Sequence, residues 1–302
     1  MTPATDDSLV SWSEIKDVEL VIVRRLQELA IGAHLSAFHG SGHDLAGLRD
    51  WQPGDRLSTI DWPQSTLTNF SPLVTREFDQ ESNAPVVIAA DISQSTRCGV
   101  GEASIAKRIA RVVATFAMAA AFFQDRAGLV TFDRDMRRIT VRPRVGRAHA
   151  MHCVEMYQRE LLGDGDTRPR AVSSFAGLLR TRSLVPVVSD FLFDDPHLLL
   201  RELTNLNATH DVFLVMIDSA FAFELPPLSA GWVEGYDIET GRSQLLSSHD
   251  LTGLGQRVRA WQDSVEQTAT GSGLDVLRIG DDSRPFHDTL VSFLLERKRS
   301  KR

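Results

Sequence analysis

Asp91, Ser93 and Ser95 form an Asp-x-Ser-x-Ser pattern directly after the apolar run 85–90. One carboxylate and two hydroxyls on a single turn are hard oxygen donors of the kind that Mg²⁺ binds. A second aspartate, Asp190, ends a later apolar run. Ligands of open α/β sheets bind beyond the carboxyl ends of the strands. If the two runs are neighbouring parallel strands, both carboxylates and both hydroxyls therefore line one pocket, where the carboxylates balance a divalent charge.

The same residue types also have a purely structural explanation. Asp and Ser fill turns through hydrogen bonds to nearby backbone groups. In that interpretation, Asp91 and Asp190 are N-caps of the helices that follow their strands. The spacing alone leaves both interpretations open.

Hydrophobic periodicity predicts the elements that carry these residues. Strands are expected at 86–91, 127–132, 136–141, 184–190, 211–217 and 274–279, and helices at 12–29, 102–123, 147–161, 175–182, 196–206, 249–270 and 285–297. The connection between the second and third strands is too short for a parallel crossover and predicts an antiparallel hairpin. Alternating strands and helices indicate an α/β fold, a mostly parallel sheet with helices on both faces.

The N-terminal part of the chain has a different texture. Glycine and proline interrupt every short apolar run between residues 31 and 85, which predicts an irregular β-rich arm. We therefore expect two parts: residues 1–84, with an N-terminal helix and this arm, and residues 85–302, the α/β domain. A second hairpin is expected as an insertion near residues 220–248, with Gly241 in its turn.

Composition limits the classes of function. The formal net charge of −7 over 302 residues argues against a dedicated nucleic-acid binder. Two cysteines do not support a disulfide framework and fit a reducing compartment. The first residues do not resemble a signal peptide, and no apolar run reaches the roughly 20 residues of a transmembrane helix, so a cytoplasmic location is expected. The basic tail 297–302 is expected to be a solvated end, with peripheral contact to anionic lipid or an acidic partner as the alternative.

Asp91-x-Ser93-x-Ser95, followed by a strand that ends in Ser189-Asp190, resembles the metal-ion-dependent adhesion site (MIDAS) of the von Willebrand factor A fold. The resemblance implies that Asp91, Ser93, Ser95 and Asp190 are ligands of Mg²⁺ or Mn²⁺. An antiparallel edge strand is also typical of that fold.

The same resemblance implies one further ligand, a threonine just before the helix expected at residue 175. This chain has serines there. We expect Ser173 to provide the hydroxyl, and Ser174 and Thr167 are the alternatives. The departure from threonine puts the metal affinity in doubt.

A longer resemblance covers residues from about 15 to 298. It rests on the segments Gly32–Ser36, Leu48–Asp55, Ile60–Trp62 and Arg76–Phe78, with later support from 224–226 and 237–241. In this order they are similar to the domain-of-unknown-function-58 family, in particular to its short MxaS-like members. The resemblance implies a MoxR-type AAA+ ATPase as partner, and a role in maturation, metal insertion or remodelling of a client protein complex.

Polar residues of the arm resemble a buried network that fixes the arm on the main domain. These arm-docking residues are His34, Arg49, Asp55, Asp61 and Trp62. They contain no nucleophile with a base and an orienting group, so they do not indicate catalysis. No Walker A pattern occurs in the chain, which is therefore not expected to be an ATPase itself.

These observations predict a metal-dependent protein-interaction adaptor that is not an enzyme. The alternatives are a metal-dependent hydrolase that uses the same oxygen cluster, and a structural module whose metal site is vestigial.

Overall fold

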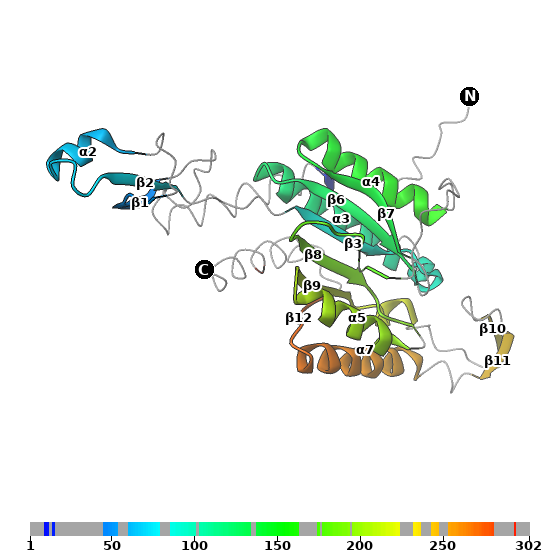
Figure 1. Cartoon of the computed structure of the whole chain (residues 1–302). Coiled ribbons are helices and arrows are strands. Elements are labelled where there is room, and N and C mark those ends of the chain that lie inside the picture. Colours follow the sequence, from blue (N-terminus) through cyan, green and yellow to red (C-terminus); the bar gives the residue numbers. More distant parts are fainter. Residues whose placement is uncertain are drawn as a thin grey trace, which may run out of the picture. The chain divides into compact units, whose positions relative to one another are not determined.

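The computed structural model describes residues 9–11, 14–15, 45–53, 60–78, 85–100, 103–133, 137–162, 174–175, 177–193, 195–223, 232–236, 243–247, 253–280 and 293. The chain divides into two compact units (Figure 1): Leu26–Asn83, and Met1–Arg25 together with Ala84–Arg302. The boundary expected at residues 84 and 85 stays a prediction.

The larger unit contains a six-stranded sheet in the order β12-β9-β8-β3-β6-β7. Its strands are β3 (Val86–Asp91), β6 (Ala127–Phe132), β7 (Arg137–Arg144), β8 (Leu184–Ser189), β9 (Asp211–Ile217) and β12 (Asp275–Ile279). All neighbours pair in parallel except β6 and β7, which form the expected antiparallel hairpin at the edge. The predicted α/β fold with a mostly parallel sheet is confirmed.

Helices cover both faces of this sheet because its strands are apolar on both sides. The helices are α3 (Ile105–Phe122), α4 (Arg147–Leu162), α5 (Pro196–Asn207) and α7 (Leu254–Gly271). Helices α3 and α4 pack on β3, β6 and β7, whereas α5 and α7 pack on β9 and β12. On the α5 and α7 face, Val87 and Ala89 belong to the same buried cluster as Leu203 and Val265.

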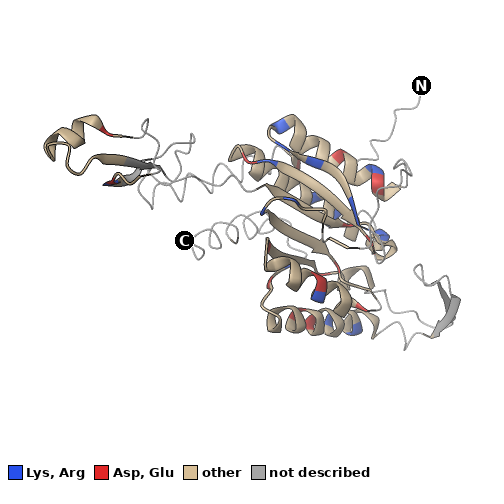
Figure 2. Cartoon of the chain, in the orientation of Figure 1, with Lys and Arg blue, Asp and Glu red and all other residues tan. Residues whose placement is uncertain are grey.

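Charged residues lie mostly on the helices, and the sheet interior is nearly free of them (Figure 2). Strands β3, β6 and β8 together contain one charged residue, Asp91, and its side chain is fully buried. A buried carboxylate is costly unless it is paired or binds a cation. Asp91 is therefore the residue of the sheet that most needs an explanation.

Short elements complete the larger unit. A 3₁₀ turn, η3 (Gln94–Arg97), follows β3, and β4 (Gly99–Val100) and β5 (Ala103–Ser104) form a small antiparallel pair. A second 3₁₀ turn, η4 (Ala220–Phe223), follows β9, and β10 (Trp232–Tyr236) pairs antiparallel with β11 (Ser243–Ser247) at the place of the second expected hairpin. No described helix is both long and apolar enough to cross a bilayer.

The smaller unit contains an antiparallel pair, β1 (Leu45–Asp50) with β2 (Val74–Phe78), and a helix, α2 (Trp62–Leu67). Asp61 caps α2 by accepting a hydrogen bond from the Gln64 amide at 3.1 Å, and Pro63 lies in the first turn. The buried Ser65 hydroxyl donates to Asp61 O at 2.7 Å and accepts from the Val74 amide at 2.9 Å, which ties α2 to β2.

The prediction of a helix at 175–182 is wrong. Its described residues form a turn, in which the Leu178 amide donates to Phe175 O and Gly177 has a φ of 86°. Phe175, Leu178 and Leu179 have helical spacing, but they pack against the buried cluster on the α5 and α7 face. The helices expected at 12–29 and 285–297 lie almost entirely outside the described residues.

Candidate functional site

The carboxyl ends of β3 and β8 lie side by side where the strand order reverses, because the chain continues from β3 to β6 on one side and reaches β8 on the other. Asp91 is the last residue of β3, and Asp190 directly follows β8. The structure thus places both predicted carboxylates at the switch point, where open α/β sheets bind ligands.

The turn after β3 brings both serines to the same place. The Ser93 amide donates to Asp91 Oδ1 at 2.7 Å, which folds the turn back on the strand. The Ser93 and Ser95 hydroxyls lie 3.1 Å apart, and the Ser95 hydroxyl donates to Asp190 Oδ1 at 3.3 Å. All four side chains are buried. The carboxylates of Asp91 and Asp190 and the hydroxyls of Ser93 and Ser95 therefore lie close together. We call these four groups the oxygen cluster.

The two carboxylates act on each other. Burial, and then the negative charge of Asp190, raises the pKa of Asp91 to about 8. Burial also raises the pKa of Tyr157, whose hydroxyl donates to the Asp91 carbonyl at 3.0 Å, with smaller contributions from both aspartates. Among the described residues, the Asp91 carboxylate receives hydrogen bonds from the Ser93 amide and the Ser189 hydroxyl, and from no Lys, Arg or His.

This donor set fits a divalent cation. Mg²⁺ and Mn²⁺ take oxygen ligands, and the charge of such an ion would offset the repulsion that raises the pKa of Asp91. The described residues hold no cluster of three or more His, Cys, Asp or Glu. A site built from sulfur or imidazole ligands is therefore not supported in the described part of the chain.

Neither aspartate is the N-cap of the helix that follows it. Ser104 caps α3 by accepting from the Lys107 amide at 3.1 Å, and Asp195 caps α5 by accepting from the His197 amide at 3.1 Å. Asp190 Oδ1 instead accepts from the Leu192 amide at 3.1 Å, within its own turn. The helix-capping interpretation of Asp91 and Asp190 is therefore wrong.

Ser189 is a site residue whose role the sequence reasoning missed. Its hydroxyl donates to Asp91 Oδ2 at 2.5 Å and accepts from the Phe191 amide at 2.8 Å. The parallel register of β3 and β8 pairs Ala90 with Val188, so that Ser189 lies opposite Asp91. The available signal was the position of Ser189 as the last strand residue before Asp190.

Helix α7 holds the backbone that follows β8. The Gln262 side chain is fully buried, and its Nε2 donates to Asp190 O and to Ile217 O, each at 2.8 Å. The Trp261 indole donates to Phe191 O at 3.0 Å. Phe191 has a φ of 55°, in the left-handed region. These two side chains fix the strained turn that aims the Asp190 carboxylate, and no sequence pattern indicated either role.

Of the three candidates for the third hydroxyl ligand, the structure describes one. Ser173 and Thr167 lie outside the described residues. Ser174 is described, and its hydroxyl donates to Glu202 Oε1 at 2.8 Å. The Phe175 amide donates to the same oxygen, and Arg137 pairs with the other Glu202 oxygen at 3.3 Å. Glu202 of α5 thus anchors Ser174 and Phe175.

The proposed arm-docking residues have local roles where they are described. Asp61 caps α2, Arg49 donates to the Asp50 carbonyl at 3.1 Å, and the Trp62 side chain is 56% exposed. His34 and Asp55 lie outside the described residues. Docking of the arm on the main domain stays a prediction.

Comparison with known proteins places the chain among uncharacterized relatives. Mb1516 of Mycobacterium bovis and Rv1480 of Mycobacterium tuberculosis, both described as uncharacterized proteins, are each 26% identical over 303 residues, covering 94% of this chain and 89% of theirs. BatB from Bacteroides thetaiotaomicron, a conserved hypothetical protein, aligns with 72% of this chain and 99% of its own at 13% identity and a TM-score of 0.42. The SpRpn10 VWA domain aligns with 68% of this chain and 93% of its own at 12% identity and a TM-score of 0.31.

A family profile described as "Protein of unknown function DUF58" matches residues 47–260. The match begins in β1 and ends within α7, so it includes both strands of the oxygen cluster and part of the smaller unit. Because it covers most of the chain, the protein belongs to the DUF58 family, as its sequence motifs predicted.

Proposed function

We propose that this DUF58 protein is a metal-dependent protein-interaction adaptor that works with a MoxR-type AAA+ ATPase on a client protein complex. The observation that carries the proposal is the buried oxygen cluster, in which Asp91 and Asp190 approach each other at the switch point with Ser93 and Ser95 between them. Such a cluster is unfavourable by itself, and a bound cation makes it favourable.

In this proposal Asp91, Asp190, Ser93 and Ser95 hold Mg²⁺ or Mn²⁺. When bound, the ion supplies an open coordination position for an acidic side chain of the partner. The rest of the chain orients the ligands: Ser189 holds the Asp91 carboxylate, and Gln262 holds the backbone of Asp190. Orientation by surrounding hydrogen bonds is a general property of metal sites.

Ser173 is the hydroxyl we assign to the remaining ligand position. Its neighbour Ser174 donates its hydroxyl hydrogen to Glu202 Oε1, as Ser95 donates to Asp190 Oδ1, so this bond leaves the Ser174 oxygen able to bind a metal ion. Glu202 also accepts from the Phe175 amide. Ser174 and Thr167 therefore remain the alternatives to Ser173.

We favour binding over catalysis because of the partners that the described residues give to the oxygen cluster. Among the described residues, the side chains of Asp91, Ser93 and Ser95 hydrogen-bond to no His, Lys or Cys side chain. General acid–base and nucleophilic catalysis rely on such groups. A hydrolase would have to use the carboxylates or hydroxyls of the cluster themselves as base or nucleophile, and we rank this alternative second.

Affinity capture of a MoxR-type ATPase, with Mg²⁺ or with a chelator, tests the proposal. We expect Asp91→Ala to abolish capture while the fold persists, and the chelator to abolish capture by the unaltered protein. Equal recovery with Mg²⁺ and with chelator would refute the metal bridge.

Asp218→Asn is the matched control. Asp218 directly follows β9, as Asp190 follows β8, and its carboxylate likewise accepts a backbone amide, that of Ala220, at 3.1 Å. This carboxylate also has a cationic partner, Arg278, at 3.4 Å. Capture by this variant should match that of the unaltered protein. A loss equal to that of Asp91→Ala would point to a general effect of strand-end aspartates.

A further inference from the structure

A cavity of about 420 Å³ lies at the end of the sheet opposite the oxygen cluster. Pro85, Arg126 and Ser183, the residues that directly precede β3, β6 and β8, line it. The oxygen cluster lies where β3 and β8 end, and a six-residue strand spans roughly 20 Å. The cavity is therefore separate from the proposed metal site.

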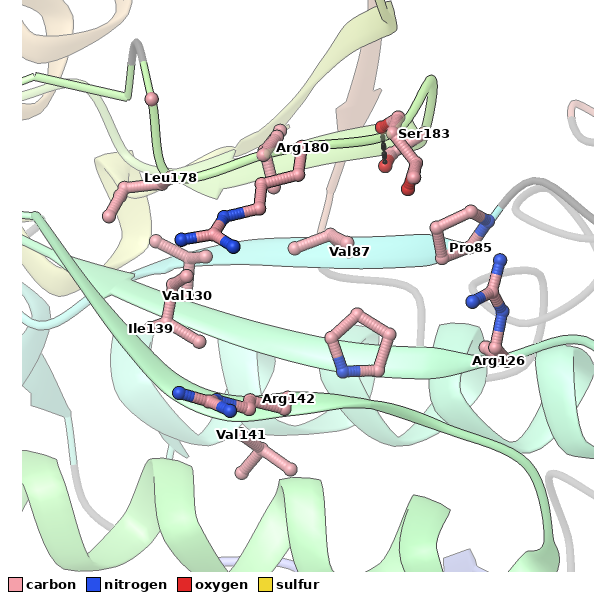
Figure 3. Close-up of a pocket in the computed structure, with 14 residues that line it drawn as sticks. Pro85, Val87, Arg126, Val130, Ile139, Val141, Arg142, Leu178, Arg180 and Ser183 are labelled. Carbon is pink, nitrogen blue, oxygen red and sulfur yellow. Dashed lines mark hydrogen bonds between the residues drawn. The ribbon is translucent and has the colours of Figure 1, made fainter.

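The interior of the cavity is apolar. Val87, Val130 and Ile139 of the sheet form its floor, and Leu178 and Leu179 come from the turn that covers this face (Figure 3). A volume of about 420 Å³ falls within the range of pockets that enclose small organic ligands. The segment predicted as a helix at 175–182 forms a turn instead, and this turn provides the upper wall.

Three arginines surround this apolar interior. Arg142 of β7 and Arg180 of the covering turn lie toward one end of the cavity in Figure 3, and Arg126 lies toward the other. All three are exposed, and no lining residue in the described part of the chain is acidic. The guanidinium groups of Arg142 and Arg180 form no ion pair with the described residues. A concave site lined by charges of one sign attracts ligands of the opposite sign, even on a protein whose net charge is −7.

We propose that this cavity binds a small amphiphilic anion, with an apolar body against Val87, Val130 and Ile139 and a carboxylate or phosphate group held by Arg142 and Arg180. The arginines of the lining indicate the anionic group of the ligand, and its apolar residues indicate the apolar body. Guanidinium groups match the planar, bidentate geometry of carboxylate and phosphate oxygens. The apolar floor excludes a small inorganic anion as the whole ligand, because such an ion would leave this surface uncovered.

Fluorescence titration with 8-anilinonaphthalene-1-sulfonate, an amphiphilic anion, tests the proposal on the full chain. We expect saturable binding of one probe per chain, weakened by added salt because the contact is partly electrostatic. The double variant Arg142→Ala/Arg180→Ala should weaken binding by about tenfold, equivalent to about 1.4 kcal/mol. Chelator should leave the binding unchanged, since the oxygen cluster takes no part in it.

Two further variants test whether probe binding depends on this cavity. Arg201→Ala removes another exposed arginine, which lies on α5 outside the cavity, and this variant should bind the probe as the unaltered protein does. Leu179→Glu places a carboxylate in the wall and should weaken binding through repulsion of the anion. Equal affinities of the double variant and Arg201→Ala would overturn the proposal, as would equally tight binding of the uncharged N-phenyl-1-naphthylamine.

Competition identifies the anionic group. Displacement of the probe by decanoate assigns a carboxylate ligand, and stronger displacement by decyl phosphate assigns a phosphate ligand. Displacement by neither would contradict the proposed ligand class.

Discussion

Asp91→Asn should stabilise the metal-free protein near pH 8, although it alters a buried polar cluster. Burial and Asp190 raise the pKa of Asp91 from 3.8 to about 8. Asparagine keeps the side-chain shape and the acceptor for the Ser93 amide, and it has no charge to bury. The substitution removes an unfavourable charge at the cost of rearranging one hydrogen bond with Ser189.

The sign and size of this stability difference follow from the linkage between proton binding and folding. Below pH 3.8 the carboxyl is protonated in both the folded and the unfolded chain. Between 3.8 and about 8 the unfolded chain loses this proton while the folded chain keeps it, so the free energy of unfolding falls as pH rises. The slope is about 1.4 kcal/mol per pH unit at most, and the dependence flattens above the folded pKa. Asp91→Asn lacks this pH dependence. Near pH 8 we therefore expect its free energy of unfolding to exceed that of the unaltered protein by about a few kcal/mol.

Differential scanning calorimetry across this pH range, in chelator and in Mg²⁺, measures the effect. In chelator the variant should melt higher near pH 8, by about 2–4 °C for each kcal/mol. In Mg²⁺ at roughly 100 times its Kd the unaltered protein should gain about 2.7 kcal/mol, and the variant should gain little. Parallel pH curves in chelator, or a variant that is less stable there near pH 8, would refute the reasoning.

Two predictions concern the side chains that hold the site. Gln262→Leu removes the Nε2 donor of the buried carbonyls of Asp190 and Ile217. We therefore expect urea denaturation to show a free energy of unfolding lower by about 2–4 kcal/mol, and an unchanged midpoint would contradict this role. Glu202→Gln weakens the hydrogen bonds that hold Ser174 and Phe175, so calorimetric titration should show weaker Mg²⁺ binding. An Mg²⁺ affinity equal to that of the unaltered protein would show that these hydrogen bonds do not support the metal site.

Much of the oxygen cluster could be predicted because its signals are local in sequence. Asp91 and Asp190 each end an apolar run, and strand ends in a parallel sheet meet at one edge. Ser93 and Ser95 lie on the same turn as Asp91, so their proximity needs no long-range information. The α/β fold followed from the alternation of apolar runs with helical patterns, which is the strongest signal in a single sequence.

The supporting residues could not be predicted because their roles depend on tertiary contacts. Gln262 is a polar residue of an amphipathic helix, and such a position usually faces solvent. Only the packing of α7 against the ends of β8 and β9 makes it a buried donor. The turn that begins at Phe175 failed as a helix for a related reason, since its apolar residues have helical spacing and tertiary packing on the sheet decides their conformation.

Anomalous diffraction from crystals grown with Mn²⁺ would locate a bound metal ion. We expect one anomalous peak between the Asp91, Asp190, Ser93 and Ser95 oxygens, and no such peak in Asp91→Asn crystals. A peak elsewhere on the protein, or no peak at the oxygen cluster, would contradict the proposed metal site.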